Sequence, residues 1–132
     1  QPTSPLRGPE HIDEVVSLLR DNSDMDSAIT VQEVILSPYW MVRRDNAHLR
    51  PFVDDGVDYS LIRRQDLNEV YKPNGAVYAS RTQLLRDKGV IFSTFSGGNT
   101  GYVIMTQMSS LEIDTETDFL VIEAVLKGKA HI

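Results

Sequence analysis

Glu112 and Asp114 stand one residue apart, and carboxylates at this spacing can hold a metal ion. Residues i and i+2 of an extended segment point to the same face, so the two carboxylates would lie together. Magnesium binds through hard oxygen ligands, and it takes one or two such carboxylates together with the phosphate oxygens of a substrate. A structural interpretation stays open, in which Asp114 caps a following helix and Glu112 faces solvent.

Two neighbouring arginines, Arg63 and Arg64, are followed by Gln65 and Asp66, and this run has the chemistry of an anion clamp. A guanidinium can pair with a carboxylate through two parallel hydrogen bonds, and Gln65 could bond a hydroxyl beside it. The alternative is a pair of solvated surface charges.

The segment 73–78 (PNGAVY) has the pattern of a tight turn that leads into a strand. In that arrangement Asn74 could direct its amide at a ligand, and Tyr78 could offer its ring face and hydroxyl. The commoner alternative is a turn followed by a core tyrosine.

Other kinds of site find little support in the sequence. It contains no Gly-x-x-x-x-Gly-Lys-Ser/Thr and no Gly-x-Gly-x-x-Gly motif, and the pair Gly97-Gly98 is more typical of a flexible loop than of a phosphate site. The absence of cysteine excludes thiolate chemistry and fits a reducing compartment, so we expect a cytoplasmic protein. His11, His48 and His131 are far apart, and we interpret them as ordinary surface histidines.

The charge balance argues against some partners. The 13 basic and 19 acidic side chains give a formal net charge of −6, which does not suit a nucleic-acid or anionic-membrane binder. No apolar run approaches the roughly 20 residues of a membrane span, and no signal peptide is recognisable. Residues 40–72 differ because they carry 6 basic and 6 acidic side chains. This neutral segment holds Trp40 and Phe52, next to Tyr39, and we favour an interface over a core for these aromatic residues.

The elements that must position these residues are predicted from periodicity and from turn signals. Helices are expected where apolar residues recur at helical spacing, and strands where β-branched and aromatic residues cluster. The predicted helices begin at Pro9, at residue 82 and at residue 114 or 115, where Thr115 and Asp118 have capping-box spacing. The predicted strands are 28–34, 76–79 and 102–105, with a hairpin of 39–44 and 49–53. Residues 72–75 are predicted to form a turn, and residues 61–70 fit either a short helix or an irregular loop.

These elements predict a fold class. A chain of 132 residues is expected to form one domain, and helices at both ends with short strands between them predict a mixed α/β layered fold. The sequence starts at Gln1 without an initiator methionine, and its opening residues are typical of the interior of a domain. We therefore expect a piece of a longer chain.

Five segments, taken in order, resemble the C-terminal part of the acylneuraminate cytidylyltransferases, also called CMP-sialic acid synthetases. The segments are QPTSPLR at 1–7, SPYW at 37–40, RRQDL at 63–67, PNGAVY at 73–78 and EIDTETDF at 112–119. The resemblance covers essentially the whole chain, residues 1–132, and the ordered set is more specific than any single segment.

The resemblance implies a nucleotidyltransferase. Members of this family transfer CMP from CTP to a nine-carbon acidic sugar of the sialic acid type and release pyrophosphate, with Mg²⁺. It also implies a three-layer, Rossmann-like nucleotide-sugar transferase fold, truncated here, with an inserted β-rich dimerisation arm at about residues 35–59. We therefore expect a homodimer or a higher oligomer.

The resemblance also assigns site residues by motif position. Arg64 would clamp the carboxylate of the sugar, and Asp114 matches a catalytic, metal-binding aspartate. Glu112 stands where many members have a second aspartate, and its extra methylene displaces the oxygen ligands. The residues matched to substrate contacts are Gln1, Ser4, Arg64, Gln65, Asn74 and Tyr78. We expect Arg64 and the carboxylates of Glu112 and Asp114 to converge on one cleft.

The chain departs from the family pattern in one respect. The family has a glycine-rich loop with arginine and lysine that holds the CTP triphosphate, and this sequence contains no such loop. We therefore expect the chain by itself to be inactive as a cytidylyltransferase. Two alternatives stay open: an activity on a related acidic sugar, and a non-catalytic dimerisation or acidic-sugar-binding module that retains the fold.

Overall fold

The structure is a computed structural model that describes residues 1–129, and it divides into two compact units. Unit 1 combines residues 1–32 with the chain from residue 73 onward. Unit 2 consists of residues 33–72. Each unit carries some of the predicted site residues and is described by itself.

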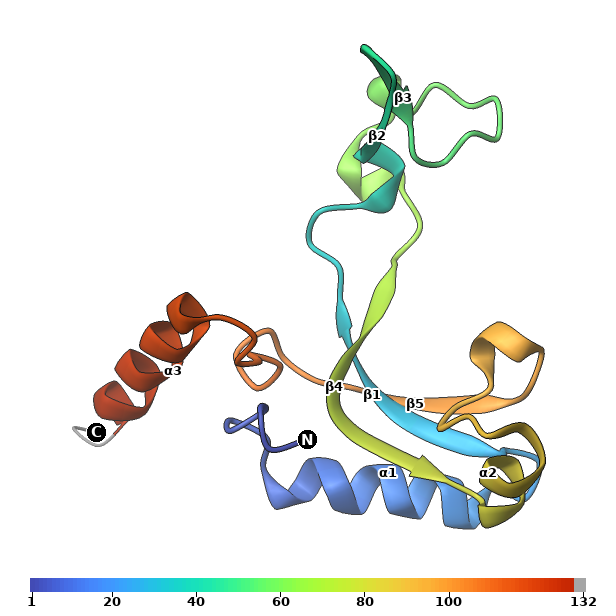
Figure 1. The fold of residues 1–132 in the computed structure, drawn as a ribbon, viewed down its shortest axis with the longest axis vertical. Coiled ribbons are helices and arrows are strands. Elements are labelled where there is room, and N and C mark those ends of the chain that lie inside the picture. The colour runs from blue at the N-terminus through green and yellow to red at the C-terminus, as the bar shows by residue number, and fades with distance from the viewer. Residues whose placement is uncertain (130–132) are drawn as a thin grey trace. The chain divides into compact units, whose positions relative to one another are not determined.

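Unit 1 is built on a three-stranded sheet with the order β4-β1-β5. The strands are β1 (Ser27–Glu33), β4 (Tyr71–Ser80) and β5 (Thr100–Ile104). β5 runs parallel to β1, with Ser27 opposite Thr100, whereas β4 runs in the opposite direction (Figure 1). The strands predicted at 28–34 and 102–105 are confirmed, with bounds that differ by one or two residues.

Helix α1 (Pro9–Asp21) lies along the sheet (Figure 1) and supplies one side of the core. Pro9 suits the first helical position because its missing N–H would have no partner within the helix. The apolar spacing then turns Val15 and Leu19 inward, and both are buried. They pack with four buried side chains of the sheet region, namely Ala28, Ala76, Val77 and Met105. The predicted first helix is confirmed.

Two further helices belong to unit 1, α2 (Thr82–Lys88) and α3 (Glu116–Lys129). Both were expected from the sequence. The start of α3 carries the predicted capping box: the Asp118 amide donates to Thr115 Oγ1 at 3.3 Å, and the Thr115 amide donates to Asp118 Oδ2 at 2.8 Å. Thr115 therefore caps this helix, and the interpretation of Asp114 as its cap is wrong.

Unit 2 contains the predicted hairpin, formed by β2 (Val42–Asp45) and β3 (His48–Pro51). The turn between them begins at Asn46, whose φ of 54° lies in the left-handed region that asparagine tolerates. The first predicted strand starts later than expected because Pro38–Trp40 forms a 3₁₀ turn, with the Ser37 hydroxyl accepting from the Tyr39 amide. Residues 61–70 are irregular apart from short 3₁₀ turns, Tyr59–Leu61 and Arg64–Asp66.

The turn predicted at 72–75 is wrong, because these residues lie inside β4. Pro73 is tolerated there because β4 is an outer strand of the sheet, where one side needs no ladder hydrogen bond. Gly75 has a φ of +71°, so the glycine that indicated a turn produces an irregularity within a continuous strand.

Taken together, the sheet and helices of the described chain have the predicted mixed α/β character. None of the helices within residues 1–129 has the length and apolar character needed to cross a membrane.

Candidate functional site

Three of the five motif segments meet in unit 1, although they are far apart in the sequence. The main-chain nitrogen of Gln1 donates to the carbonyl oxygen of Ala76 at 3.1 Å. The amide of Ile113 donates to the carbonyl oxygen of Thr3 at 2.8 Å. Segment 1–7 thus lies against both the PNGAVY segment and the EIDTETDF segment, and side chains of all three surround one place.

Arg7 fastens this junction. Its Nη1 donates to the carbonyl oxygen of Ala76 at 2.6 Å and to that of Gln1 at 3.0 Å. Sequence reasoning did not single out Arg7, although it closes the QPTSPLR segment. Its role is to hold main chain to main chain, and no local pattern distinguishes such an arginine from a solvated one.

Gly75 lies at the centre of the junction and leaves room for two side chains. A Cβ at this position would come within 2.6 Å of Glu112 Oε1 and 3.2 Å of Gln1 Oε1. Thr3 Oγ1 lies 3.4 Å from Gln1 Oε1 and 3.5 Å from Glu112 Oε1. Gln1, Thr3 and Glu112 therefore form a polar platform over Gly75.

Ser4 lies in the same segment and is only 2% exposed. Its hydroxyl has no hydrogen-bond partner among the described residues. Buried polar atoms are nearly always paired, so this hydroxyl is a position where a ligand or a water molecule would complete the bonding.

Asn74 is buried, and its amide is bonded entirely within the protein. Its Nδ2 donates to Ser110 Oγ at 2.8 Å, and its Oδ1 accepts from Thr30 Oγ1 at 2.7 Å and from the Ala76 amide at 3.2 Å. Both polar ends are therefore occupied. These bonds fix the main chain of β4 beside Gly75. Asn74 therefore positions the site and does not face a ligand.

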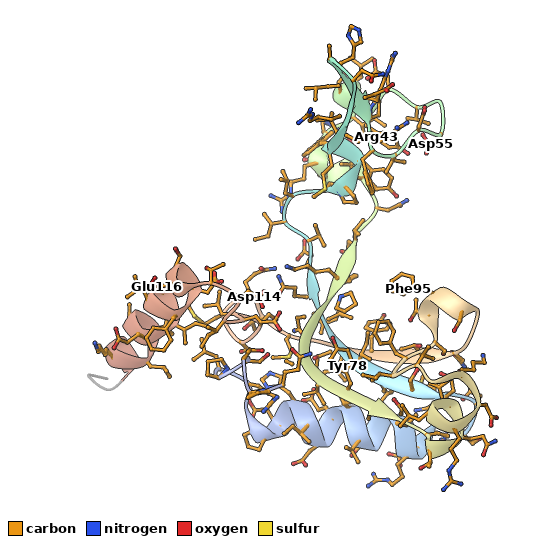
Figure 2. The ribbon with its side chains drawn as sticks, viewed as in Figure 1. Arg43, Asp55, Tyr78, Phe95, Asp114 and Glu116 are labelled. Carbon is orange, nitrogen blue, oxygen red and sulfur yellow. The ribbon has the colours of Figure 1, made fainter. Side chains whose placement is uncertain are left out.

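Tyr78 belongs to an aromatic wall that we define as Tyr78, Phe92 and Phe95 (Figure 2 labels the first and last). The rings of Tyr78 and Phe92 stack with centroids 5.8 Å apart, and Phe95 meets Phe92 at 5.9 Å. Partial burial, and secondly the charge of Glu112, raise the pKa of the Tyr78 hydroxyl. Tyr78 lies on the same strand as Gly75, β4. Phe92 was missed by the sequence reasoning because a lone phenylalanine carries no motif.

The two carboxylates predicted to hold a metal differ in their surroundings. Glu112 is half-buried over Gly75, whereas Asp114 is exposed, and its amide donates to Asp118 Oδ2 at 3.2 Å. Within residues 1–129 no group of three or more histidine, cysteine, aspartate or glutamate side chains is placed to hold a metal ion. The magnesium site on Glu112 and Asp114 therefore stays a prediction, which rests on two carboxylates in one short segment.

Arg64 and Gln65 lie in unit 2. Arg63 Nε bonds Asp66 Oδ2 at 2.9 Å, whereas the Arg64 guanidinium has no ion-pair or hydrogen-bond partner among the described residues. Arg64 is therefore the arginine that is available to an anion. It opens onto a hollow of about 440 Å³ whose lining residues are Glu33, Arg64, Gln65, Leu67 and Glu69.

The structure thus gathers Gln1, Ser4, Asn74, Tyr78 and Glu112 in unit 1, with Asp114 nearby in the sequence. Arg64 and Gln65 belong to the other unit. The convergence of Arg64 with the carboxylates on one cleft stays a prediction.

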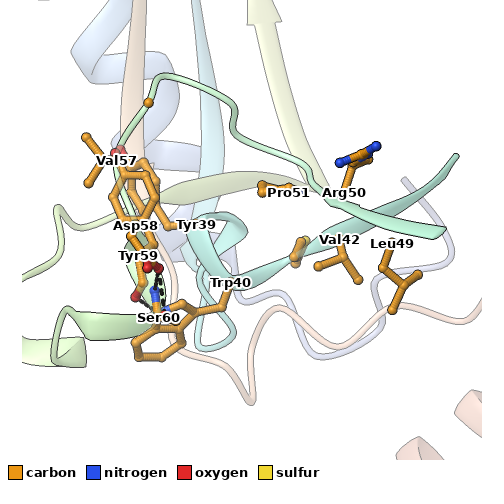
Figure 3. A pocket seen from close by; sticks show the side chains of 12 residues that line it. Tyr39, Trp40, Val42, Leu49, Arg50, Pro51, Val57, Asp58, Tyr59 and Ser60 are labelled. Atoms are coloured by element: carbon orange, nitrogen blue, oxygen red, sulfur yellow. Dashed lines mark hydrogen bonds between the residues drawn. The ribbon is translucent and has the colours of Figure 1, made fainter.

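A second hollow of unit 2, of about 470 Å³, lies beside the hairpin (Figure 3). Tyr39 stacks on Tyr59 with ring centroids 4.6 Å apart, and Trp40 Nε1 donates to the carbonyl oxygen of Tyr59 at 2.8 Å. The Tyr59 hydroxyl donates to Asp55 Oδ2 at 2.7 Å, and this bond raises the pKa of Tyr59 to about 12. The aromatic residues thus make a small cluster that leaves apolar side chains of the hairpin exposed.

The histidines need one correction. His11 is half-buried, and its Nδ1 accepts from the Gly8 amide at 3.0 Å, so it stabilises the start of α1. His48 is exposed on β3, as expected of a surface histidine. His131 lies outside the described residues.

Comparison with known proteins finds relatives that are named as cytidylyltransferases. No family model matches the chain. The N-acylneuraminate cytidylyltransferase of Streptococcus agalactiae serotype III is 34% identical over 122 residues, which are 91% of this chain and 27% of that protein. The enzyme of the same name from Escherichia coli O18:K1:H7 is 33% identical over 120 residues, which are 90% of the chain and 27% of that protein.

A third relative has a different name. The post-translational flagellin modification protein B of Campylobacter coli is 30% identical over 66 residues, which are 50% of this chain and 26% of that protein. The resemblance inferred from the five segments is confirmed by the cytidylyltransferase matches. The chain spans 27% of the length of those two relatives, so it corresponds to a part of each.

Proposed function

We propose that this chain is the acidic-sugar-binding part of a nucleotidyltransferase, a CMP-sialic acid synthetase. The complete enzyme would transfer CMP from CTP to a nine-carbon acidic sugar and release pyrophosphate. The observation that carries the proposal is the meeting of three motif segments around Gly75, in a chain related to cytidylyltransferases over 91% of its length.

The sugar would lie on the polar platform. Gln1 and the unpartnered hydroxyl of Ser4 would bond its hydroxyl groups, and the ring of Tyr78 would bound the pocket. Arg64 would pair with the sugar carboxylate, because its guanidinium is free to accept an anion, and Gln65 would bond a neighbouring hydroxyl. We assign Asn74 to the pocket as a positioning residue, since its amide is bonded inward.

Asp114 and Glu112 would hold Mg²⁺ in the complete enzyme. The bound ion would neutralise charge on the phosphates of the nucleotide. The protein's own contribution is to present two carboxylates from one segment, of which Glu112 lies over Gly75 with Oε1 3.5 Å from the Thr3 hydroxyl. The platform meanwhile would hold the reacting sugar hydroxyl in place, which is positioning work.

For the whole protein we propose a Rossmann-like three-layer fold, a cytoplasmic location and a homodimer formed through residues 35–59. That segment lies within unit 2, where apolar side chains are exposed: Leu49 is 67% and Phe52 is 62% accessible. Surfaces of this kind mark protein–protein contacts. Neither a nucleic acid nor a membrane is proposed as a partner.

The test is titration of the purified chain with free N-acetylneuraminic acid, followed by calorimetry or ligand-observed NMR. Arg64→Ala is expected to abolish binding, because the sugar carboxylate loses its counter-charge. Arg63→Ala is the matched control, since that arginine already pairs with Asp66, and it should bind as the unchanged chain does. Equal loss in both variants, or no loss in Arg64→Ala, would contradict the assignment.

A non-catalytic sugar-binding or dimerisation module is the second candidate, and the absence of a phosphate-binding loop from these 132 residues favours it. With CTP, Mg²⁺ and sugar, we expect the chain by itself to bind without turnover. Robust formation of CMP-sugar would contradict this expectation, and with it the proposal of a non-catalytic module.

A further inference from the structure

We infer that Asp26 is a positioning residue that holds the aromatic wall in place. Its importance for sugar binding rests on the proposed function, whereas its hold on the wall can be tested by itself. Asp26 lies directly before β1 and makes no part of the junction around Gly75. It acts through the loop 93–99, which follows Phe92.

The Asp26 carboxylate accepts hydrogen bonds from three donors. Its Oδ1 accepts from Ser27 Oγ at 2.8 Å and from Ser93 Oγ, and its Oδ2 accepts from the Asn99 amide at 3.3 Å. Two of these donors lie at opposite ends of the loop 93–99. One carboxylate therefore closes the loop against the start of β1.

The main chain reinforces this closure. The Asp26 amide donates to the carbonyl oxygen of Asn99 at 3.0 Å, and the Gly98 amide donates to that of Ser93 at 3.0 Å. A Cβ on Gly98 would collide with the Ser93 hydroxyl and with Asp26 Oδ2. Glycine is thus needed at position 98 for the loop to approach the carboxylate.

The closure reaches the aromatic wall because Phe92 is held on both sides. Ser93 is fully buried, and its amide also donates to Thr100 Oγ1 at 3.2 Å. On the other side of Phe92, the carbonyl oxygen of Ile91 accepts from Ser80 Oγ. The main chain that carries the Phe92 ring is therefore fixed where the ring stacks on Tyr78.

Asp26 is suited to this work because it is ionised. Partial burial raises its pKa, but the hydrogen bonds from Ser93, Ser27 and Asn99, with the charge of Lys88, lower the pKa overall. A carboxylate can only accept, so every donor around it finds a lone pair. An asparagine amide of the same shape would turn an NH₂ group toward one of these donors.

A wall that is already ordered reduces the entropy lost when a ligand binds against it. Asp26 would thus contribute to ligand affinity without touching the ligand.

The experiment compares Asp26→Asn with the unchanged chain by NMR. We expect amide exchange of Ser93, Gly98 and Asn99 to become at least tenfold faster, and the cross-peaks between the Tyr78 and Phe92 rings to weaken. Asp24→Asn is the matched control, because Asp24 bonds only the side chain of Asn99 in this loop, and it should leave the rings unchanged. Unchanged exchange and unchanged ring contacts in Asp26→Asn would overturn the inference.

If Asp26→Asn does not fold, Ser93→Ala gives the same test by removing one donor, with the same expected loosening of the Phe92 ring. Titration with N-acetylneuraminic acid separates the two proposals. If Asp26→Asn loosens the aromatic wall and the unchanged chain does not bind the sugar, the role of Asp26 is supported and the proposed function is contradicted. If Asp26→Asn leaves the aromatic wall undisturbed and the unchanged chain binds the sugar, the role of Asp26 is overturned and the proposed function is supported.

Discussion

Gly75 is constrained twice, by its backbone conformation and by the side chains packed over it. Its φ of +71° disfavours any residue with a Cβ, and a Cβ would also meet Glu112 and Gln1. We expect Gly75→Ala to destabilise the chain by at least the about 1–3 kcal/mol that a left-handed alanine costs, because the ends of the Glu112 and Gln1 side chains must also shift. Urea unfolding measures this loss.

Gly89→Ala is the control for that measurement. Gly89 also has a positive φ, of +64°, but nothing lies within 4 Å of a Cβ there. It isolates the cost of the backbone, and the excess in Gly75→Ala is the cost of the collision. Equal losses in the two variants would mean that the Gln1 and Glu112 side chains move aside without a measurable cost.

Tyr59 gives a prediction for alkaline pH. Its hydrogen bond to Asp55 raises its pKa to about 12, so its stabilising contribution is intact below the ordinary tyrosine pKa of about 10 and is lost as the pH rises through the folded value. Ultraviolet titration should find one tyrosine ionising near 12. Asp55→Asn should lower that transition, whereas Asp54→Asn should not. The same late transition in Asp55→Asn would show that another tyrosine is responsible.

Residue types alone indicated an arginine, a carboxylate pair and an asparagine, but not what each would contact. Arg63 and Arg64 are equivalent as letters, and only the 3₁₀ turn that brings Arg63 onto Asp66 separates them. Asn74 was a reasonable ligand contact until its amide proved to be bonded to Thr30 and Ser110. The partners of a polar side chain depend on long-range packing, which spacing does not encode.

At the scale of elements, the start of α3 supports a sharp prediction. Thr115→Ala removes the hydroxyl that accepts from the Asp118 amide and should cost about 0.5–2 kcal/mol. Hydrogen bonds from Thr115 lower the pKa of Asp118, so the capping box is intact above the ordinary aspartate pKa and opens as the pH falls through the depressed one. Hydrogen exchange of the amides in the first turn of α3 measures both effects, and we expect it to become faster, relative to the intrinsic rate, in Thr115→Ala and at low pH.

Thr117→Ala is the control because Thr117 is exposed within the same turn. It should leave the exchange rates near those of the unchanged chain. Equal effects of the two substitutions would show that the faster exchange comes from replacing any threonine in this turn, and would contradict the capping role of Thr115.

Elements set by local chemistry were predictable, and those set by their neighbours were not. The apolar spacing of α1, the capping box of α3 and the hairpin all follow from residues within one or two turns of chain. The PNGA sequence, by contrast, has every local signal of a turn and lies in β4, because pairing with β1 and the bonds of Asn74 override it.

At the scale of the whole molecule, the proposed dimer is testable through the hairpin. Cross-strand partners share a face, so Leu49 and its partner Arg44 lie on one face, while Arg43 and Arg50 lie on the other. We expect the chain to sediment as a dimer at micromolar concentration and Leu49→Lys to shift it toward monomer. Arg43→Gln, on the opposite face, should leave the dimer intact.

A monomer in the unchanged chain would contradict the proposed dimer directly. Loss of the dimer in Arg43→Gln as well as Leu49→Lys would place the contact elsewhere than on the Leu49 face.

The meeting of residues 1–7 with residues 112–119 is the whole-molecule feature that periodicity does not predict. It joins two segments that are more than a hundred residues apart in the sequence. The link consists of a few main-chain hydrogen bonds, such as the bond from the Ile113 amide to the Thr3 carbonyl oxygen. The resemblance to cytidylyltransferases selected these segments together, whereas local patterns treat each of them alone.

The lone hydroxyl of Ser4 implies a trade-off between robustness and use. A buried donor without a partner costs about 1–3 kcal/mol, so Ser4→Ala should raise the melting temperature of the empty chain. The same substitution should reduce the further rise that saturating N-acetylneuraminic acid produces, since the ligand loses a bonding partner. Ser4 would then lower the stability of the ligand-free protein and contribute to the binding of the sugar.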